Sequence, residues 1–303
     1  MLCFPKIGDY GYLGNAMFQY ASLLGIANKH GVKAKYDFEK VGNMVTLHDV
    51  FDLKKAEHMD ITDQIHSVRG IWKEPHFHFS PEAFPAEEGS EDENSLTRLK
   101  DNRGLYGYFQ SEKYFKHIES DIRSEFKFSD EVEEECSSKI KEVKEMTDGN
   151  TLVSVHVRLG DYTKLEHVFY PLIKTSYYQD ALNTLGISGE QIIGEKNDTT
   201  LVVFSNDIEM SKQLFPSPKV IFVEGGSAEQ DMCLMSKCDN HIIANSSFSW
   251  WGAWLNENKN KKVIAPNHWF INDSRIQYTN DANARPEEAR TPEDLYCDGW
   301  ITI

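Results

Sequence analysis

Between residues 201 and 266 the sequence runs LVVFSNDIEMSKQLFPSPKVIFVEGGSAEQDMCLMSKCDNHIIANSSFSWWGAWLNENKNKKVIAP, in which short apolar runs alternate with longer helical segments. Short strands separated by helices of about ten residues indicate βαβ units and a parallel sheet. In such a sheet the ligand binds at the carboxyl ends of the strands, and these ends are rich here in Asn, Ser and Asp. The strands are predicted at 201–206, 219–225, 241–245 and 262–266, and the helices at 207–215, 228–238 and 247–257.

The pattern begins with one further strand on the N-terminal side. TLVSVHV (151–157) is a compact apolar run, and TDGN (147–150) separates it from a charged amphipathic helix predicted over 130–146. We therefore predict an N-terminal lobe of residues 1–150 and a C-terminal lobe of residues 151–303, whose last residues could pack back on the first lobe.

The start of the chain predicts a second ligand-facing loop. Glycines recur up to Gly14-Asn15, where a helix begins that should end before Gly31. A glycine loop that leads into a helix favours close approach to a ligand or to another chain segment. The apolar residues at helical spacing are Met17, Tyr20, Ala21, Leu24 and Ala27.

The composition excludes several classes of protein. The 303 residues are 40% hydrophobic, which supports a folded core rather than a disordered chain. With 32 Lys and Arg against 48 Asp and Glu, the formal charge of −16 argues against nucleic-acid binding. The five cysteines form no CxxC pair, which favours reduced thiols. We see neither a membrane-spanning run nor a signal peptide and expect a cytoplasmic protein.

The segment HVRLGDY (156–162) begins at the end of the strand predicted at 151–157 and contains a candidate anion-binding group. The guanidinium of Arg158 can give two parallel hydrogen bonds to a phosphate, which lysine cannot match. Gly160 lets the backbone approach a ligand closely, and Asp161 can fix the arginine or a backbone amide. The alternative is a buried structural ion pair at the end of a strand.

Two further loops follow predicted strands. After Asn245, the residues Ser246, Ser247 and Phe248 lead into a helix whose N-terminal amides can bind an anion, although the serines could equally be ordinary helix caps. The tryptophans of this helix are expected in the core. The second loop, Phe204-Ser205-Asn206-Asp207, leads into a helix that Asp207 could cap. Asp231, in the first turn of its helix, can accept two hydrogen bonds from the guanine edge. Alternatively, its negative charge interacts favourably with the helix dipole and has no further role.

The sequence carries no recognisable metal or nucleotide-loop motif. A GxxxxGK[ST] loop, a GxGxxG fingerprint and an acidic pair of the DxD type after a strand are all missing. The pair His76-x-His78 lacks further ligands at useful spacing, so alternating residues of a strand explain it better than a metal site. We therefore expect no metal and no bound cofactor.

Together these segments resemble glycosyltransferase family 11, the galactoside α-1,2-fucosyltransferases. The resemblance spans nearly the whole chain, with the blocks in the order of the family. It implies an α/β fold of the two-lobed GT-B type with Rossmann-like parallel sheets. It also implies GDP-fucose as donor, a galactose-containing glycan as acceptor, and inverting transfer without a metal. The blocks are Gly14 to Ala21, GYFQSEKYF (107–115), HVRLGDY (156–162), FSNDI (204–208) and the residues from Asp231 to Leu255.

The resemblance also implies roles for individual residues. Arg158 matches an arginine that contacts the β-phosphate of the donor. The other donor-binding candidates are Asn15, Ser205, Asn206, Asp231, Ser246, Ser247 and Phe248. On the acceptor side we expect Glu74, Tyr108 and Gln110. The general base stays open among Glu74, His156 and Asp161, and an early-dissociating donor could do without one.

Two departures from the family pattern keep alternatives open. Leu159 stands where the family commonly has a second arginine, and Ala16 stands where it commonly has glutamine. The loss of a cation and an amide leaves the linkage, the acceptor and the sugar undecided. The alternatives are a transferase of the same architecture with another donor or linkage, such as α-1,3-fucosyl transfer, and a glycan-binding protein without catalytic activity.

Overall fold

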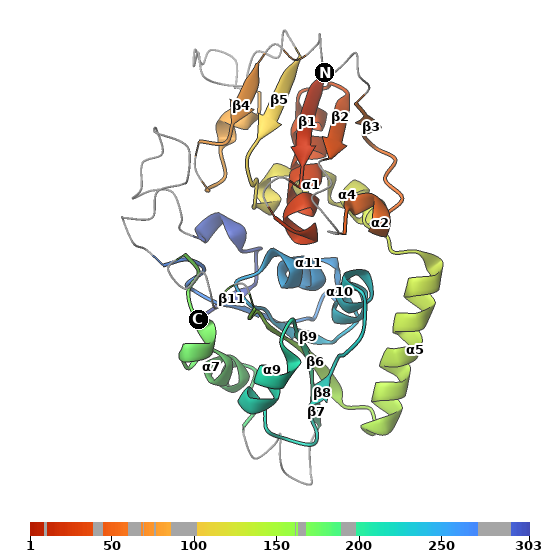
Figure 1. Cartoon of the computed structure of the whole chain (residues 1–303), viewed down its shortest axis with the longest axis vertical. Helices are drawn as coiled ribbons and strands as arrows, with labels where there is room; N and C mark the ends of the chain where they lie inside the picture. The colour runs from red at the N-terminus through yellow and green to blue at the C-terminus, as the bar shows by residue number, and fades with distance from the viewer. Residues whose placement is uncertain are drawn as a thin grey trace. The chain divides into compact units, whose positions relative to one another are not determined.

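A computed structural model (Figure 1) describes residues 1–8, 11–38, 45–59, 68, 70–75, 77–85, 102–160, 162, 168–188, 198–271 and 292–303. The chain forms two compact units, one of Met1–Lys127 with Gln277–Tyr296 and one of Phe128–Ile276 with Cys297–Ile303. Each unit contains its own parallel sheet with helices, so the predicted α/β class is confirmed.

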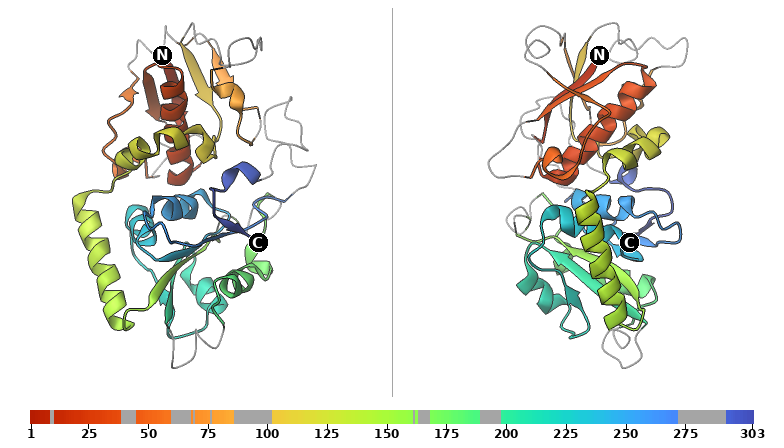
Figure 2. Two further views of the ribbon diagram at one scale, coloured as in Figure 1. Left: turned by 180° about the vertical axis from the view of Figure 1, so that it is seen from behind. Right: turned by 90° about the vertical axis from the view of Figure 1, so that its right-hand side faces the viewer.

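The first unit has a five-stranded sheet in the order β3-β2-β1-β5-β4, with every neighbouring pair parallel. Helix α1 packs against β1 (Figure 2) and ends before Gly31, which adopts the left-handed conformation (φ +63°) that favours glycine after a helix. The strands are β1 (Leu2–Ile7), β2 (Ala34–Phe38), β3 (Glu57–His58), β4 (Ile71–Lys73) and β5 (Arg103–Tyr106). The helices are α1 (Leu13–Lys29), α2 (Leu47–Val50) and α4 (Glu119–Glu125), with short 3-10 turns η1 (Pro81–Ala83), η3 (Glu112–Tyr114), η4 (Lys116–Ile118) and η6 (Glu293–Leu295).

The second unit has a six-stranded parallel sheet in the order β11-β10-β9-β6-β7-β8. Counted along the chain from β6, this order is 3-2-1-4-5-6 when read from β8, which is the arrangement of dinucleotide-binding folds. The strands are β6 (Thr151–Val157), β7 (Thr199–Ser205), β8 (Ile221–Phe222), β9 (Asn240–Ile242), β10 (Val263–Ala265) and β11 (Ile301–Thr302). The helices are α5 (Asp130–Met146), α7 (Tyr177–Thr184), α9 (Ile208–Leu214), α10 (Ala228–Ser236) and α11 (Ser247–Leu255), with the 3-10 turn η5 (Leu172–Lys174).

The tryptophans of α11 lie in the core, as expected. Trp250 and Trp251 are fully buried, with ring centroids 4.9 Å apart, and Trp254 stacks at 6.2 Å from Trp250. Trp300, just before β11, also contacts Trp250. This aromatic cluster holds α11 against the segment that precedes β11.

The division between the units falls before α5 rather than after it. Helix α5 packs on α10, where Cys136 Sγ donates to the carbonyl oxygen of Gln230 (3.5 Å) and Lys237 pairs with Glu133. An amphipathic helix is stable where its apolar face finds a partner, and here that partner is α10. Helix α5 therefore belongs to the second unit.

The end of the chain contributes to both units. Asp294 in η6 accepts a hydrogen bond from the backbone N–H of Phe79 (2.9 Å) and pairs with Lys113, both in the first unit. The following residues form β11, which pairs with β10 in the second sheet. Among the described residues, no helix combines the length and apolar character that crossing a membrane requires.

Candidate functional site

The strand order of the second sheet indicates where a ligand binds. Neighbouring strands β6 and β9 are the point at which the order reverses, and ligands of open α/β sheets bind outside the carboxyl ends of the strands at such a point. The loops that leave these two strands contain Arg158 and the start of α11. Two of the predicted segments thus meet at one edge of the sheet, where the ring of His156 lies 5.7 Å from that of Phe248.

His156 is a neutral side chain at this edge. It is 5% exposed, and burial, reinforced by the charge of Arg158, lowers its pKa to about 3. Its Nδ1 atom has no hydrogen-bond partner within the described part of the chain. A neutral imidazole with an unused nitrogen suits hydrogen bonding to a ligand better than proton uptake.

Ser205 and Asn206 hold the loop that presents Arg158. The carboxamide of Asn206 accepts from Leu159 N (2.8 Å) and donates to Leu159 O (3.1 Å). Ser205 Oγ donates to the carbonyl oxygen of Val157 (2.8 Å). Gly160 is in the left-handed region (φ +62°), and a Cβ there would lie 2.5 Å from Asn206 Nδ2. Ser205 and Asn206 therefore support the backbone of residues 157–160. Direct contact of these two side chains with a donor stays a prediction.

The loop before α11 presents backbone amides at the same edge. Ser246 occupies the N-cap position, but its side chain makes no capping hydrogen bond. The first amides of a helix have no intrahelical partner, so the turn that starts with Ser247 and Phe248 offers N–H groups and the positive end of the helix dipole. Asn245 is buried, and its Nδ2 donates to the carbonyl oxygens of Tyr170 (3.0 Å) and Trp269 (2.9 Å).

Asp231 is a second group with an unused buried atom. It lies in the first turn of α10, which begins shortly after β8. Its Oδ1 is buried without a hydrogen-bond partner among the residues that the structure describes, and burial raises its pKa to about 6, a shift that the charge of Lys139 reduces. A Cβ on Gly226 would lie 2.5 Å from this oxygen, so any larger residue at this position would crowd the carboxylate.

In the first sheet the order also reverses next to β1, where its neighbour is β5. Gln110, which follows β5, donates from Nε2 to Asn15 Oδ1 (2.7 Å) in the first turn of α1. Two residues predicted from separate motifs are therefore in direct contact. Tyr108 is half-buried beside them, and its ring packs 6.1 Å from that of Phe77.

Glu74 supports the turn that presents Tyr108 and Gln110. Its Oε2 accepts from the backbone N–H groups of Tyr108 (2.8 Å) and Phe109 (2.9 Å), and Tyr114 OH donates to Oε1 (3.3 Å). Phe109 is held with a positive φ of 54°, which is a strained conformation for a bulky residue. Burial raises the pKa of Glu74 to about 8, although these hydrogen bonds oppose the shift.

Sequence analysis did not identify Gln19, which is fully buried in α1. Its Oε1 accepts from Gly8 N (2.9 Å) and its Nε2 donates to Gly107 O (2.9 Å), so it joins the loops after β1 and β5. Ser22, one turn further, donates to Phe109 O (3.2 Å). Asn15, Gln19 and Ser22 follow helical spacing in a helix that is otherwise apolar here, and this polar stripe is the signal that could have revealed it.

Several remaining predictions concern other parts of the chain. Asp161 and His76 lie outside the described residues. Phe77 and His78 come after β4 has ended and are not in a strand, so the alternating-strand explanation of the histidine pair is wrong for them. No group of three His, Cys, Asp or Glu residues in the described ranges could hold a metal ion.

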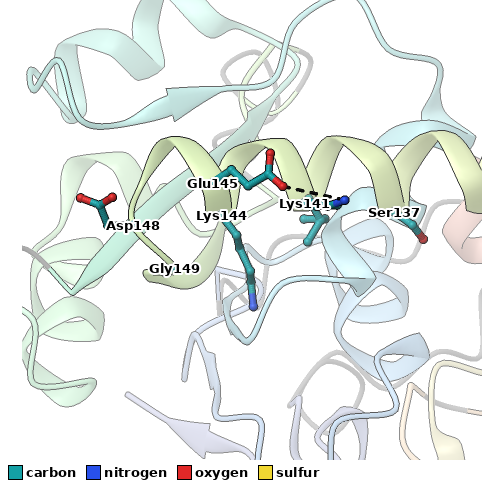
Figure 3. Close-up of a pocket in the computed structure, with 7 residues that line it drawn as sticks. Ser137, Lys141, Lys144, Glu145, Asp148 and Gly149 are labelled. Atoms are coloured by element: carbon teal, nitrogen blue, oxygen red, sulfur yellow. Dashed lines mark ion pairs between the residues drawn. The ribbon is translucent and has the colours of Figure 1, made fainter.

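A shallow hollow on α5 contains none of the predicted site residues. It is lined by one stretch of the helix and the turn after it (Figure 3), where Lys141 and Glu145 form an ion pair of 3.8 Å. Neither of these side chains is buried, and exposed pairs of this kind contribute little energy. The hollow offers no arrangement of groups comparable to that at the sheet edges.

Comparisons with known proteins agree with this architecture. The family model described as glycosyl transferase family 11 matches residues 6–289. An alpha-1,2-colitosyltransferase of Escherichia coli is 34% identical over 277 residues, 86% of this chain and 90% of that protein. Galactoside alpha-(1,2)-fucosyltransferase 1 of Leontocebus fuscicollis is 27% identical over 255 residues, 81% of this chain but 63% of that protein, so the match spans less than two thirds of its length.

A solved structure shares the fold. A single-site variant of Arabidopsis thaliana FUT1 in complex with GDP superposes with a TM-score of 0.52 at 14% identity, covering 86% of this chain and 69% of the other. At this identity the likeness shows the fold alone. The predicted GT-B-type fold with two parallel sheets is confirmed.

Proposed function

The chain belongs to glycosyl transferase family 11, and on this premise we propose that it transfers L-fucose from GDP-fucose to O2 of a galactose unit in a glycan. The transfer inverts the anomeric carbon and uses no metal. The name of galactoside alpha-(1,2)-fucosyltransferase 1 supports this choice of sugar, acceptor class and linkage.

One observation carries the proposal: Arg158 and the N-terminus of α11 occupy the two loops at the reversal point of the second sheet. As the bond between fucose C1 and the phosphate oxygen breaks, GDP gains negative charge, and stabilising that charge is the main task of the enzyme. A guanidinium and a set of helix amides can do this where other transferases use a divalent ion.

Asp231 of the second unit suits recognition of the guanine base. Guanine presents adjacent N–H donors on one edge, and Asp231 has a buried oxygen without a partner among the described residues. We assign Asp231 to this edge. Ser205 and Asn206 act by fixing the loop of Arg158.

In the first unit, the contact between Asn15 and Gln110 marks the region that we assign to the sugar and the acceptor. Tyr108 is half-buried there and can offer its ring to a pyranose. Glu74 accepts hydrogen bonds from two amides and a tyrosine, which favours a role in fixing this region over proton removal. The reaction needs little base assistance if the donor dissociates early.

The position of Leu159 explains how the chain can lack the second arginine of the family pattern. Its side chain is 2% exposed and belongs to the hydrophobic core of the second unit, with Val157 and Leu172. The leucine side chain adds to the hydrophobic core. Arg158 then supplies the positive charge at this edge of the sheet without a second arginine beside it in the sequence. We expect donor binding to depend more strongly on Arg158 for this reason.

A second candidate donor is GDP-colitose, because the relative named alpha-1,2-colitosyltransferase is 34% identical over most of the chain. Colitose is fucose without the 3-hydroxyl, so both donors share GDP and the 6-methyl group. They are separated by steady-state competition between the two donors with one galactoside acceptor. A kcat/KM at least tenfold higher for GDP-colitose would replace fucose in the proposal.

The test uses the full chain with GDP-fucose, GDP-mannose and UDP-galactose as ligands and a β-galactoside as acceptor. We expect stabilisation by the guanosine nucleotides, α-1,2-linked product by NMR, and unchanged activity in EDTA. Arg158→Ala should lose about 10²–10³ in kcat, or roughly 2.7–4 kcal/mol, by analogy with the removal of one oxyanion-hole donor. The control is Arg123→Ala, which removes an arginine that pairs with Glu119 on α4.

Four results would contradict parts of the proposal. Wild-type turnover by Arg158→Ala would remove its central residue. Loss of activity in EDTA that Mn²⁺ restores would exclude the metal-free mechanism. Binding of GDP-fucose with neither transfer nor hydrolysis would favour a glycan-binding protein, and an α-1,3-linked product would change the linkage.

A further inference from the structure

We infer that Tyr162 is a positioning residue, which holds the guanidinium of Arg158 for the diphosphate and ties it to the loop before α11. This inference rests on the proposed function, because it concerns how Arg158 meets a nucleoside diphosphate. Tyr162 ends the segment HVRLGDY, and neither the sequence nor the comparisons give it a role.

The guanidinium of Arg158 packs against the ring of Tyr162. Arg158 Cζ lies 5.0 Å from the ring centroid, within the range of a cation–π interaction. The same ring stacks on Phe169 with centroids 3.8 Å apart and planes 9° apart. A ring that is held by a parallel neighbour offers the guanidinium a fixed surface rather than a mobile one.

The hydroxyl of Tyr162 reaches the other half of the site. It donates to the carbonyl oxygen of Asn245 (3.2 Å), directly before the N-cap of α11. The side chain of Asn245 in turn donates to Tyr170 O (3.0 Å), the neighbour of Phe169. The contacts therefore form a closed circuit from Tyr162 through Asn245 and the 169–170 segment back to Tyr162.

The backbone is fixed at the same place. Tyr162 N donates to Leu159 O (3.2 Å), the oxygen that also accepts from Asn206. Residues 159 and 162 are thus anchored on both sides of Gly160. The backbone segments that bear Arg158 and Tyr162 are therefore held by hydrogen bonds to the same oxygen, Leu159 O.

This arrangement has a consequence for binding. An arginine side chain loses much rotamer entropy when it is fixed on a phosphate, and a ring that already restricts it removes part of that loss. The link to Asn245 keeps the guanidinium and the amides of α11 in one geometry. Tyr162 should therefore contribute to recognition of the β-phosphate and contribute nothing to recognition of the guanosine.

The test compares GDP with GMP by isothermal titration calorimetry on the full chain, since GMP lacks the β-phosphate. Tyr162→Leu should lower the preference for GDP over GMP about tenfold, which is the scale of a cation–π contact. Tyr162→Phe keeps the ring but loses the bond to Asn245, and should lower the preference about threefold. The control is Tyr177→Phe, which loses the hydrogen bonds to Ile243 O (2.5 Å) and Ile264 O (3.2 Å) and should keep the preference.

Arg158→Ala distinguishes a failure of the proposed role of Arg158 from a failure of the role inferred for Tyr162. If it leaves the preference for GDP intact, the proposed role of Arg158 is wrong and the inference falls with it. If it abolishes the preference while both Tyr162 variants stay within twofold of wild type, the inference alone is overturned. Adding Tyr162→Leu to Arg158→Ala should cause no further loss of the preference, because the ring acts through the guanidinium. If Tyr162→Leu is unfolded by circular dichroism, Tyr162→Phe tests the link to Asn245 alone, and a preference for GDP within twofold of wild type then overturns the inference.

Discussion

If Asp231 binds the guanine edge as proposed, its carboxylate couples the stability of the protein to nucleotide binding. Burial raises its pKa from 3.8 to about 6, so ionisation costs more in the folded protein than in the unfolded chain. The folded protein should therefore lose stability as the pH rises from about 4 to about 6. The shift corresponds to at most about 3 kcal/mol, and partial exposure of the side chain reduces that value. Asp231→Asn removes this loss and should be more stable than wild type at pH 7.5, with the difference shrinking towards pH 4.

Binding should change in the opposite sense. If the carboxylate accepts hydrogen bonds from the guanine edge, only the ionised form binds GDP well. With a pKa of about 6, roughly a quarter of the groups are ionised at pH 5.5, so GDP affinity should be about fourfold weaker there than at pH 7.5. Asp231→Asn replaces an acceptor with a donor and loses a charged hydrogen bond, which should weaken GDP binding at least about tenfold at pH 7.5. The variant should also lose the pH dependence.

Two measurements check this reasoning: urea unfolding at pH 4.5 and 7.5, and calorimetric titration of GDP at pH 5.5, 6.5 and 7.5. Inosine diphosphate lacks the 2-amino group and should bind wild type more weakly than GDP but bind Asp231→Asn about equally. The matched control is Asp207→Asn, because Asp207 caps α9 by accepting from Met210 N (3.1 Å) and asparagine caps a helix as well. Wild-type GDP affinity in Asp231→Asn at pH 7.5 would refute the assignment.

Three further changes test the supports of the two sites. Gly226→Ala puts a methyl group 2.5 Å from Asp231 Oδ1 and should weaken GDP binding about tenfold by calorimetry; unchanged affinity would show that the carboxylate is not approached from that side. Glu74→Gln removes a carboxyl group whose pKa is raised to about 8, and this shift makes the wild-type protein lose stability as the pH rises from 4.5 to 8. The unfolding free energy of the variant, measured in urea, should therefore rise relative to that of wild type over this range. A difference that stays constant with pH would contradict the shift. Gln19→Met leaves Gly8 N and Gly107 O without their partner and should cost about 2–3 kcal/mol of unfolding free energy, compared with about 1 for Ser22→Ala; equal losses would argue against a special role of Gln19.

The parallel sheet of the second unit could be predicted because its signal is local. Each strand predicted between 201 and 266 is present. The strands predicted at 201–206 and 262–266 end one residue early, at Ser205 and Ala265, whereas the strand predicted at 219–225 covers only Ile221–Phe222 and that at 241–245 covers Asn240–Ile242. The residues between the end of β9 and α11 form the loop that leads to the proposed site. Strand order could not be predicted, because it depends on contacts between residues far apart in sequence, and the reversal points of both sheets follow from it.

The site could be predicted as a set of segments but not as a set of contacts. Asn206 and Leu159 are 47 positions apart, and Gln19 and Gly107 are 88 apart. Composition and spacing identify polar residues at strand ends, yet they do not say whether an amide faces a ligand or the backbone of another loop. Leu159 shows the same limit, since only the structure shows that this side chain lies in the hydrophobic core of the second unit.

The hydrogen bonds divide the polar residues of the second unit into two groups with different expected sensitivities. The carboxamides of Asn206 and Asn245 and the hydroxyl of Ser205 are already bonded to backbone atoms, so they can fix loops but have little capacity left for a ligand. His156 Nδ1 and Asp231 Oδ1 are buried and, over the residues described, have no such partner. A buried polar atom without a partner is costly, and a ligand that supplies the missing hydrogen bond recovers that cost on binding. Substitutions in the first group should therefore lower stability and affinity together, whereas those at His156 and Asp231 should lower affinity while stability is kept or improved.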